Sequence, residues 1–289
     1  MIVAVRDFIT DLVNTFLTVV RMFFFTRPVK SVSQIKSGSE AVILANGPSL
    51  TGSIIKYREK FIGKDLYCVN NFAMTELYSD IKPGYYVLTG PEYWMNKVGD
   101  LYITMREELF RNLIEKTTWK LHLLIPVRAR GKKIIESLSE KNSNIHIHYY
   151  NTCPVEGLRC VNHFFYSSGI GMPRPHNVLI PTLMLTVRNR YKNVYVFGAD
   201  HTWLDKITVN DKNEALVDQQ HFYDSGSSKP GVMYMLGQRP RRLFEILHKL
   251  MLAFRAYFDI LEYSRKKRVK IVNCTPGSLI DAFDRGEMD

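Results

Sequence analysis

VILANGPSL, residues Val42–Leu50, is an apolar run that stops abruptly at four turn-forming residues. The apolar part predicts a buried strand that is closed by a turn. Gly47 permits close backbone approach, Pro48 suits the first position of a helix, and Ser49 offers a capping hydroxyl. A strand that turns directly into a helix leaves backbone N–H groups free to bind a phosphate. By itself, the stretch fits such a phosphate site and an ordinary strand-to-helix turn equally well.

Strand-like apolar runs recur along the chain after this stretch. Between most of them lie segments long enough for helices, such as 105–116 and 131–140. Strands joined by helical crossovers build a mainly parallel sheet with helices on both faces. The sequence therefore predicts an α/β, Rossmann-like domain over residues 41–289. The predicted strands are Val42–Ala45, Leu66–Val69, Tyr85–Thr89, Leu121–Ile125, Ile145–Tyr149, Val194–Phe197 and Val269–Val272.

The composition is that of a basic globular protein. The chain has 289 residues, of which 46% are apolar, so one large domain with a sizeable core can form. A formal net charge of +11 predicts an anionic partner such as a nucleotide, a phosphorylated glycan or an anionic membrane. Nucleic acid is disfavoured, because the chain has no zinc-ligand spacing, RNP-type aromatic motif or recognition-helix pattern. The four cysteines show no paired spacing, which indicates a reducing compartment.

Residues 1–30 form an N-terminal segment rich in Val, Ile, Leu and Phe. Its polar residues recur at helical spacing, which predicts an amphipathic helix. It lacks the features of a signal peptide, and charges at Arg6, Asp7 and Asp11 disfavour a membrane span. The helix is expected to lie in a membrane interface, to pack on another subunit of a homo-oligomer, or to cover its own domain, and we favour the interface. The polar stripe consists of Asp7, Thr10, Asp11, Asn14, Thr18 and Arg21.

Small residues, amides and one acid follow the predicted strands. The carboxyl ends of parallel strands meet at one sheet edge, where ligands bind. Amide side chains recognise base and ribose edges through paired donors and acceptors. We therefore expect a nucleotide site at this edge. The candidate binding residues are Asn46, Gly47, Pro48, Ser49, Asn70, Asn71, Gly198, Asp200 and Ser278.

Residues 201–237 have few apolar side chains and predict a long excursion or lid, since loops of this length are usually functional or disordered. Within them, the aromatic-rich island 219–224 indicates a segment that folds back onto the domain. His221 in this island is our candidate general base, because an imidazole titrates near neutral pH. His201 is expected to orient the loop after its strand.

Arg174 precedes a helix that is predicted over residues 177–189 and capped by Asn177. In a regular crossover its guanidinium would face the same sheet edge and bind a carboxylate or phosphate through two hydrogen bonds. A solvated surface arginine is an equal alternative. A longer helix is predicted over 239–264, and the basic run 265–268 after it suits a helix C-terminus or anionic lipid.

None of the common catalytic motifs is present. The chain has no Walker A, GxSxG or GxGxxG motif and no Asp-x-Asp pair of the kind that many metal-dependent glycosyltransferases use. Asp200, Asp205 and Asp224 lie near the predicted site and can hold Mg²⁺, although their spacing does not require a metal.

Four short blocks resemble the bacterial lipooligosaccharide sialyltransferases, which use CMP-sialic acid in a single Rossmann-like domain with a mobile lid. They also resemble a wider set of Asn-Gly-Pro-Ser proteins from surface-glycan loci and a related archaeal pterin pyrophosphokinase. The resemblance runs in order from about residue 41 to residue 283 and leaves out the N-terminal helix. The blocks are ILANGPSL (Ile43–Leu50), VNNF (Val69–Phe72), VYVFGAD (Val194–Asp200) and CTPGSL (Cys274–Leu279).

The resemblance implies a set of contacts with the donor. Asn71 would face the donor sugar, and Arg174 lies close to the substrate-binding arginine of the family. The residues implied to contact the nucleotide and its phosphate are Asn46, Gly47, Ser49, Asn70 and Asp200.

Two departures from the family concern the chemistry. Thr202 stands where the family has a phosphate-contacting tyrosine, a role that Tyr223 would take over. His221-Phe222 matches a His-Tyr pair that precedes the catalytic histidine of the family, whose position here falls near Ser225. Either His221 has taken the role of the base, or the base lies elsewhere.

The sequence thus predicts an inverting glycosyltransferase of bacterial surface-glycan assembly. It would move an acidic sugar (sialic acid, another nonulosonic acid or Kdo) from a CMP-sugar donor to a glycan or glycolipid acceptor. His221 would deprotonate the acceptor hydroxyl, while N–H groups at Gly47–Ser49 and the Tyr223 hydroxyl stabilise the departing phosphate. CMP is a good leaving group, so we expect neither a metal nor a cofactor. The enzyme would be cytoplasmic and peripheral at the inner membrane.

Two alternatives from other functional classes stay open. One is a Mg²⁺-dependent pyrophosphokinase of a pterin-like heterocycle, with Asp200, Asp205 and Asp224 as metal ligands. The other is a non-catalytic partner that keeps the pocket but lacks the base.

Overall fold

The computed structural model describes residues 2–30, 35–218, 230–235 and 239–288. Its centre is an eight-stranded sheet in which neighbouring strands run parallel. The order is β13-β12-β6-β1-β2-β3-β4-β5. The predicted α/β, Rossmann-like fold is confirmed. The strands are β1 (Glu40–Leu44), β2 (Asp65–Val69), β3 (Tyr85–Val87), β4 (Leu121–Pro126), β5 (Ile145–Tyr150), β6 (Asn193–Phe197), β12 (Lys270–Asn273) and β13 (Asp284–Arg285).

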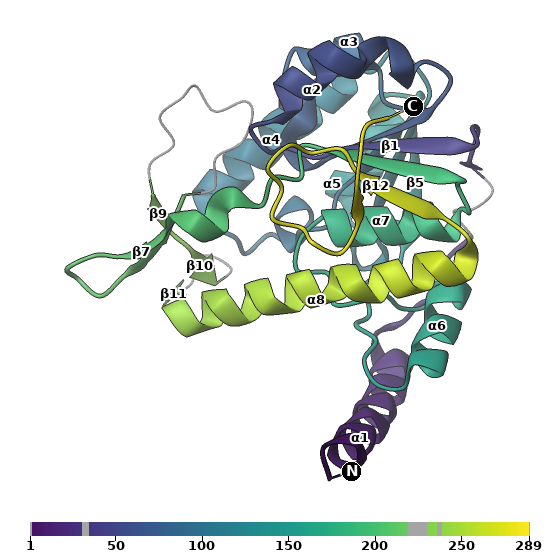
Figure 1. Ribbon diagram of the computed structural model, residues 1–289. Helices are drawn as coiled ribbons and strands as arrows, with labels where there is room; N and C mark the ends of the chain where they lie inside the picture. The colour runs from purple at the N-terminus through teal and green to yellow at the C-terminus, as the bar shows by residue number, and fades with distance from the viewer. Residues whose placement is uncertain (1, 31–34, 219–229, 236–238, 289) are drawn as a thin grey trace.

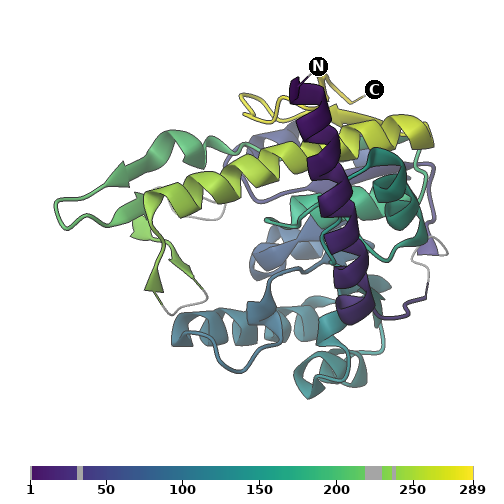
Figure 2. The ribbon, with the colours of Figure 1, turned by 90° about the horizontal axis from the view of Figure 1, so that it is seen from below.

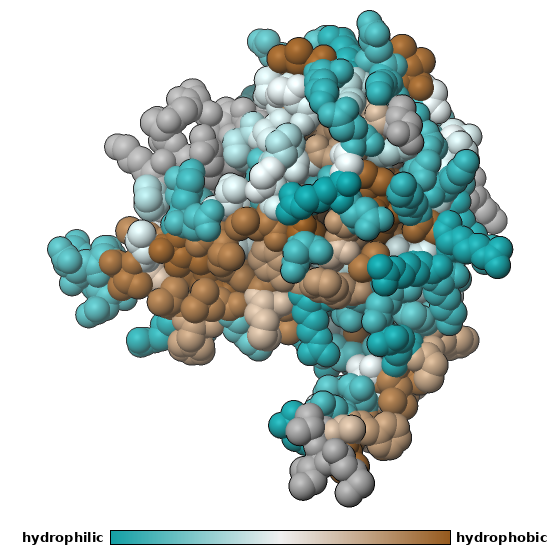
Figure 3. All heavy atoms as spheres, in the orientation of Figure 1, coloured by the Kyte–Doolittle hydropathy of each residue, from teal (hydrophilic) through white to brown (hydrophobic). Residues whose placement is uncertain are grey.

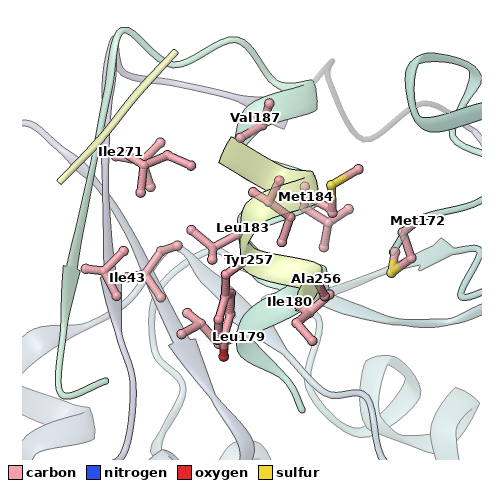
Figure 4. Packing of buried hydrophobic residues seen from close by; sticks show 14 of the residues in the cluster. Ile43, Met172, Leu179, Ile180, Leu183, Met184, Val187, Ala256, Tyr257 and Ile271 are labelled. Carbon is pink, nitrogen blue, oxygen red and sulfur yellow. The ribbon is translucent and has the colours of Figure 1, made fainter. Parts of the chain in front are cut away.

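Helices cover both faces of the sheet and enclose a hydrophobic core on each side (Figure 1). In β1, Val42 and Leu44 point into one core and Ile43 into the other, as the alternation of side chains along a strand requires. Figure 4 shows the second core, where Ile43 and Ile271 of the sheet lie near the α7 and α8 side chains. The first core lies under α2 (Leu50–Tyr57), α3 (Leu77–Ile81), α4 (Asp100–Lys116) and α5 (Lys133–Lys141), and the second under α1 (Ile2–Phe25), α6 (Arg159–Ser168), α7 (Leu179–Arg188) and α8 (Leu243–Lys267).

The order of the strands reverses once along the chain. From β1 the chain adds β2, β3, β4 and β5 in one direction, and it then returns to place β6 on the other side of β1. After β1 the chain continues to α2 on one face of the sheet, and after β6 it continues through the excursion to α8 on the other face. Such a reversal leaves a crevice between two loops, which is where open parallel sheets bind ligands.

The excursion after β6 is ordered in its described part. A short 3₁₀ helix over Thr202–Lys206 leads into a three-stranded antiparallel sheet, and a two-stranded ribbon precedes α8. The excursion is as long as the sequence predicts, but strands rather than irregular loop make up much of it. The strands are β7 (Ile207–Val209), β8 (Ala215–Val217), β9 (Gly231–Val232), β10 (Tyr234–Met235) and β11 (Arg239–Pro240).

The N-terminal helix α1 docks on the domain through its polar stripe. Thr18 exchanges hydrogen bonds with the backbone of Glu156, donating to its carbonyl over 2.8 Å and accepting from its N–H over 3.0 Å. The Thr15 hydroxyl accepts from the N–H of Leu158 over 2.8 Å. A Cβ at Gly157 would lie 2.2 Å from Thr15 Oγ1, so only glycine permits this approach. Figure 2 shows α1 crossing the side of the molecule that carries α8.

The apolar face of α1 points away from the domain. Phe8, Phe16 and Phe23 are exposed, and the window Ala4–Phe25 has a mean hydropathy of 1.5 with 11% of it buried. By length and composition this helix is apolar enough to cross a membrane, which the charges near its start led us to disfavour. Buried soluble helices and signal sequences can satisfy the same criteria, so the helix gives weak support for membrane association. Figure 3 shows further hydrophobic surface over the first half of α8.

The second long helix begins later than its apolar pattern indicates. Arg239 and Pro240 form strand β11, and α8 starts at Leu243. Glu245 fixes this start, because its carboxylate accepts the N–H of Arg242 over 2.9 Å and also pairs with Arg239. The expected cap of α7 is present, since Asn177 Oδ1 accepts the N–H of Ile180 over 3.2 Å.

Candidate functional site

A pocket of about 200 Å³ opens at the reversal of strand order. Loops after β1, β2 and β6 form its floor, and α7 and α8 form one wall. The described part of the excursion closes another side, whereas the island 219–224, from which a segment that folds back was predicted, lies outside the described residues. Predicted site residues that line the pocket are Asn46, Gly47, Pro48, Asn70, Gly198, Asp200 and Thr202.

The loop after β1 is joined tightly to the loop after β6. The N–H of Gly47 donates to the carbonyl of Gly198 over 2.7 Å. The N–H and the hydroxyl of Ser49 donate to the two carboxylate oxygens of Asp200 over 3.2 and 2.9 Å. The prediction that the N–H groups of Gly47–Ser49 are free for a phosphate is therefore wrong, because a carbonyl and a carboxylate from β6 already occupy them.

Asp200 is a buried acid at the centre of this joint. Desolvation raises its pKa, and the two hydrogen bonds from Ser49 oppose that rise. Its position close to the helix N-terminus stabilises the ionised form but also repels a second anion there. An anionic group of a ligand must therefore bind elsewhere in the pocket.

Two asparagines present polar groups from the adjacent strand ends. Asn46 Nδ2 donates to the carbonyl of Val69 over 3.1 Å, which fixes the amide, and its buried Oδ1 has no partner in the described part of the chain. Asn70 adopts a left-handed backbone with φ of 49°, and the Tyr86 hydroxyl holds its carbonyl. A buried carbonyl oxygen without a donor is costly unless a ligand supplies one.

His201 is held in the pocket wall by a relay of hydrogen bonds. Asn177 Nδ2 donates to the hydroxyl of Tyr257 over 2.8 Å, and that hydroxyl shares a hydrogen bond of 2.6 Å with His201 Nε2. Burial lowers the pKa of His201 to about 4, and the ring is neutral at pH 7. This anchoring is consistent with the predicted role of His201 in orienting the loop.

The wall opposite the asparagines is basic, which the sequence analysis missed. Lys249 and His176 line the pocket, and Arg241 lies close enough to both to lower their pKa values. Burial is the main cause for each: it lowers the pKa of Lys249, and it lowers that of His176 to about 4. Lys249 is thus a partly desolvated cation that can bind an anion, whereas His176, with its low pKa, is neutral at pH 7. A signal was available, since Lys249 lies between Ile246 and Ala253 on the buried stripe of α8.

Four of the predicted residues that the structure describes lie outside the lining of this pocket, and one of them is Ser49, whose contacts with Asp200 are given above. Arg174 is a correction: its guanidinium binds Glu156 through three hydrogen bonds of 2.9 to 3.2 Å and lines a different cavity. Asn71 Oδ1 accepts the hydroxyl of Tyr93 over 3.3 Å. Ser278 is buried and donates to the carbonyl of Ala199 over 2.7 Å, so it braces the loop after β6. Because Arg174 is paired with Glu156, it does not take the predicted role of binding a carboxylate or phosphate of the ligand.

His221, Tyr223 and Asp224 lie outside the described residues, so their predicted roles stay predictions. Asp205 is exposed in the 3₁₀ helix after β6. Within the described ranges, no group of three or more His, Cys, Asp or Glu side chains is placed to hold a metal ion.

Comparison of the chain with models of known protein families and with curated protein sequences found no match. The function must therefore be argued from the geometry of the site.

Proposed function

We propose that the chain is a glycosyltransferase that uses a nucleotide-activated acidic sugar, with a CMP-sugar as donor. The observation that carries the proposal is the juxtaposition in one crevice of a buried amide oxygen on Asn46, which has no partner among the described residues, and a wall that holds the partly desolvated Lys249 ammonium and the neutral His176 ring. The crevice lies at the reversal of strand order, where nucleotide ligands bind in open parallel sheets.

The two sides of the pocket suit the two ends of such a donor. Asn46 Oδ1 would accept a hydrogen bond from the exocyclic amino group of cytosine, which uracil lacks. Lys249 would bind the phosphate or the carboxylate of the sugar, and the neutral His176 ring adds a further polar contact. The acidic character of the donor is thus matched by the Lys249 ammonium.

The described histidines of the pocket are poor general bases. A base works best with a pKa near the working pH, and both His176 and His201 have pKa values of about 4. We therefore retain His221 as the proposed base that deprotonates the acceptor hydroxyl. The direct displacement inverts the sugar and releases CMP.

We further propose that the protein acts at the cytoplasmic face of the inner membrane. Support comes from α1, which binds the domain with its polar side and leaves its apolar side outward. The net charge of +11 would attract the protein to anionic lipid and acidic glycans. An acceptor carried on a lipid would then lie near the pocket.

A thermal-shift panel tests the nucleotide. CMP, CDP, UDP, GDP and ATP are added with and without Mg²⁺, and CMP should raise the melting temperature most, without a metal. A ligand at 100 times its Kd stabilises the native state by about 2.7 kcal/mol. Lys249→Met should lower CMP affinity about tenfold or more, because a charge-assisted contact is lost. Lys266→Met makes the same charge change on an exposed turn of α8 and should leave CMP affinity unchanged.

Two results would contradict the proposal. A shift with ATP that requires Mg²⁺ would favour the pyrophosphokinase. A panel in which no nucleotide shifts the melting temperature would leave a non-catalytic partner as the better description.

A further inference from the structure

A second cavity, of about 220 Å³ and partly open to solvent, lies where α1 meets α6 and α8. Water occupies about 30 Å³ per molecule in the liquid, so this volume corresponds to about seven waters or one small ring. Polar side chains dominate its lining. Asp11 of α1, Asn162 and Tyr166 of α6, and Arg255 and Asp259 of α8 converge on it from three helices.

Several of these groups have no partner in the protein. Tyr166 is 1% exposed, yet its hydroxyl makes no hydrogen bond to any described residue, and the same holds for the buried Oδ1 of Asn162. Asp259 and Arg255 form no hydrogen bond or ion pair within the described ranges. Unpaired polar groups are costly when they are buried, so a cavity that gathers two of them, beside the partly buried Asp259 and the exposed Arg255, is built to receive polar atoms from outside.

The charges of the lining exclude a simple ion as the preferred occupant. Glu156 is paired with Arg174, and Glu262 is paired with Arg159 over 2.9 Å. Only Asp11, Asp259 and Arg255 are left outside these pairs. A cation would face arginine and an anion would face aspartate, whereas hydroxyl groups donate to carboxylates and accept from guanidinium at the same time.

We propose that this cavity binds a single sugar ring through its hydroxyl groups. Asp259 and Asn162 Oδ1 accept, Arg255 donates, and the Tyr166 hydroxyl does either. The cavity adjoins the strand-end pocket, because Arg174 lines one and His176 the other, and successive turns of α8 contribute to both. This inference rests on the proposed function and extends it, because we assign the ring to the acceptor glycan, which is held beside the donor.

The position of the cavity favours an acceptor that is carried on a lipid. α1 forms one wall through Asp11 and exposes its phenylalanines on the opposite side. A sugar bound here would contact the same helix that carries this apolar surface. The same hydroxyl chemistry also fits a free saccharide, so the test needs separate arms for the two sources.

Saturation-transfer NMR tests the site with methyl β-galactoside, methyl β-glucoside and methyl β-N-acetylglucosaminide as soluble probes. At least one of them should bind the full-length protein. Tyr166→Phe removes only a hydroxyl without a protein partner and should weaken this binding about three- to tenfold without lowering the melting temperature. Tyr102→Phe, on an exposed tyrosine of α4, is the matched control and should not change binding. Asp259→Asn should weaken binding as well, with Asp281→Asn as its exposed control.

The lipid arm uses phosphatidylglycerol vesicles that carry a monohexosyl diacylglycerol. If the protein binds these vesicles more tightly than plain ones, and Tyr166→Phe loses this difference, the sugar belongs to a lipid-linked acceptor. If it binds both kinds of vesicle equally, the sugar belongs to a free saccharide. The inference is overturned if none of the sugars binds, if Tyr166→Phe and Asp259→Asn bind them as the parent does, or if choline or phosphate occupies the cavity instead. CMP binding is measured in parallel, so loss of one ligand without the other separates failure of this inference from failure of the proposed function.

Discussion

Gly47 lies at the tightest backbone contact around the strand-end pocket. A Cβ at this position would be 1.9 Å from Asp200 Oδ2 and 2.5 Å from the carbonyl of Gly198. The carbonyl cannot move without separating β1 from β6, which pair in register along their length. Only glycine therefore fits here, although its backbone makes no unusual turn.

Gly47→Ala should lower the free energy of unfolding by about 1–3 kcal/mol or more, as overpacking does in other interiors. The measurement is the urea midpoint. Gly52→Ala is the matched control: nothing lies within 4 Å of a Cβ there, and alanine favours helix α2 by up to about 1 kcal/mol. If both variants have the same stability, the close contact between the two loops is wrong.

Asp259 gives the stability a pH dependence. Burial is the main cause that raises its pKa, from 3.8 to about 6, with Glu262 and Glu156 adding to the rise and Arg255 and Arg159 opposing it. The folded state therefore holds this proton more tightly than the unfolded state does. The ionised carboxylate destabilises the fold above about pH 6, and this cost disappears as the pH falls to about 4.

Asp259→Asn should consequently be more stable than the parent by about 1–2 kcal/mol at pH 7.5. The gain should shrink as the pH is lowered and vanish near pH 4. Melting temperatures of the two proteins across this range test the prediction, and a constant difference would contradict it.

The position of some site residues could be predicted from their order along the chain, and the position of others could not. Asn46, Asn70 and Asp200 each come directly after a strand, so a parallel sheet brings them to one edge and the sequence could predict it. Arg174 depends on a partner 18 residues earlier in the chain, at Glu156, which no local pattern reveals. Lys249 was missed because its helix was judged by its apolar stripe rather than by the charge within it.

Helix α1 has the reverse of the usual arrangement, in which the polar side faces water. Its threonines bind the loop at 156–158, and its phenylalanines face outward. The sequence predicted the polar stripe correctly but not which side of the helix faces the domain, since that depends on the open backbone groups of a distant loop.

We expect the outward side to bind lipid. Phe16 and Phe23 are 67% and 83% exposed, and replacing both with serine should weaken binding to phosphatidylglycerol vesicles at least tenfold, since burying each ring contributes about 1.5–3 kcal/mol. Ile55→Ser, which is 79% exposed on α2 over the opposite face of the sheet, is the control. Vesicle sedimentation measures the effect, and equal binding by all variants would rule out lipid contact by α1.

All seven predicted strands are present, with ends shifted by one or two residues. Long apolar runs identified them because a parallel sheet buries both faces of its central strands. The edge strand β13 was missed, since its two residues, Asp284 and Arg285, are exposed and charged. The short strands of the excursion were missed for the same reason: their pairing rests on neighbours rather than on their own composition.

At the level of the whole molecule, one sheet with a core on each face positions both cavities and helix α1. The proposed donor pocket lies at the strand ends, and the proposed sugar cavity and α1 lie on the face that carries α7 and α8. The two cavities and the apolar helix thus lie on adjoining surfaces. This arrangement follows from the order of the strands in the sheet. The alternation of predicted strands and helices along the sequence does not determine that order.

The pairing of β1 with β6 also determines when the pocket can form during synthesis of the chain. These strands are separated by about 150 residues, and ribosomes add about 5–20 residues per second. On the nascent chain, the edge of β1 that pairs with β6 therefore stays unpaired for roughly ten seconds or longer. The pocket at these strand ends is complete only when β6 and the loop after it have been synthesised, so a product truncated before β6 would retain five of the eight strands and would lack the proposed donor pocket.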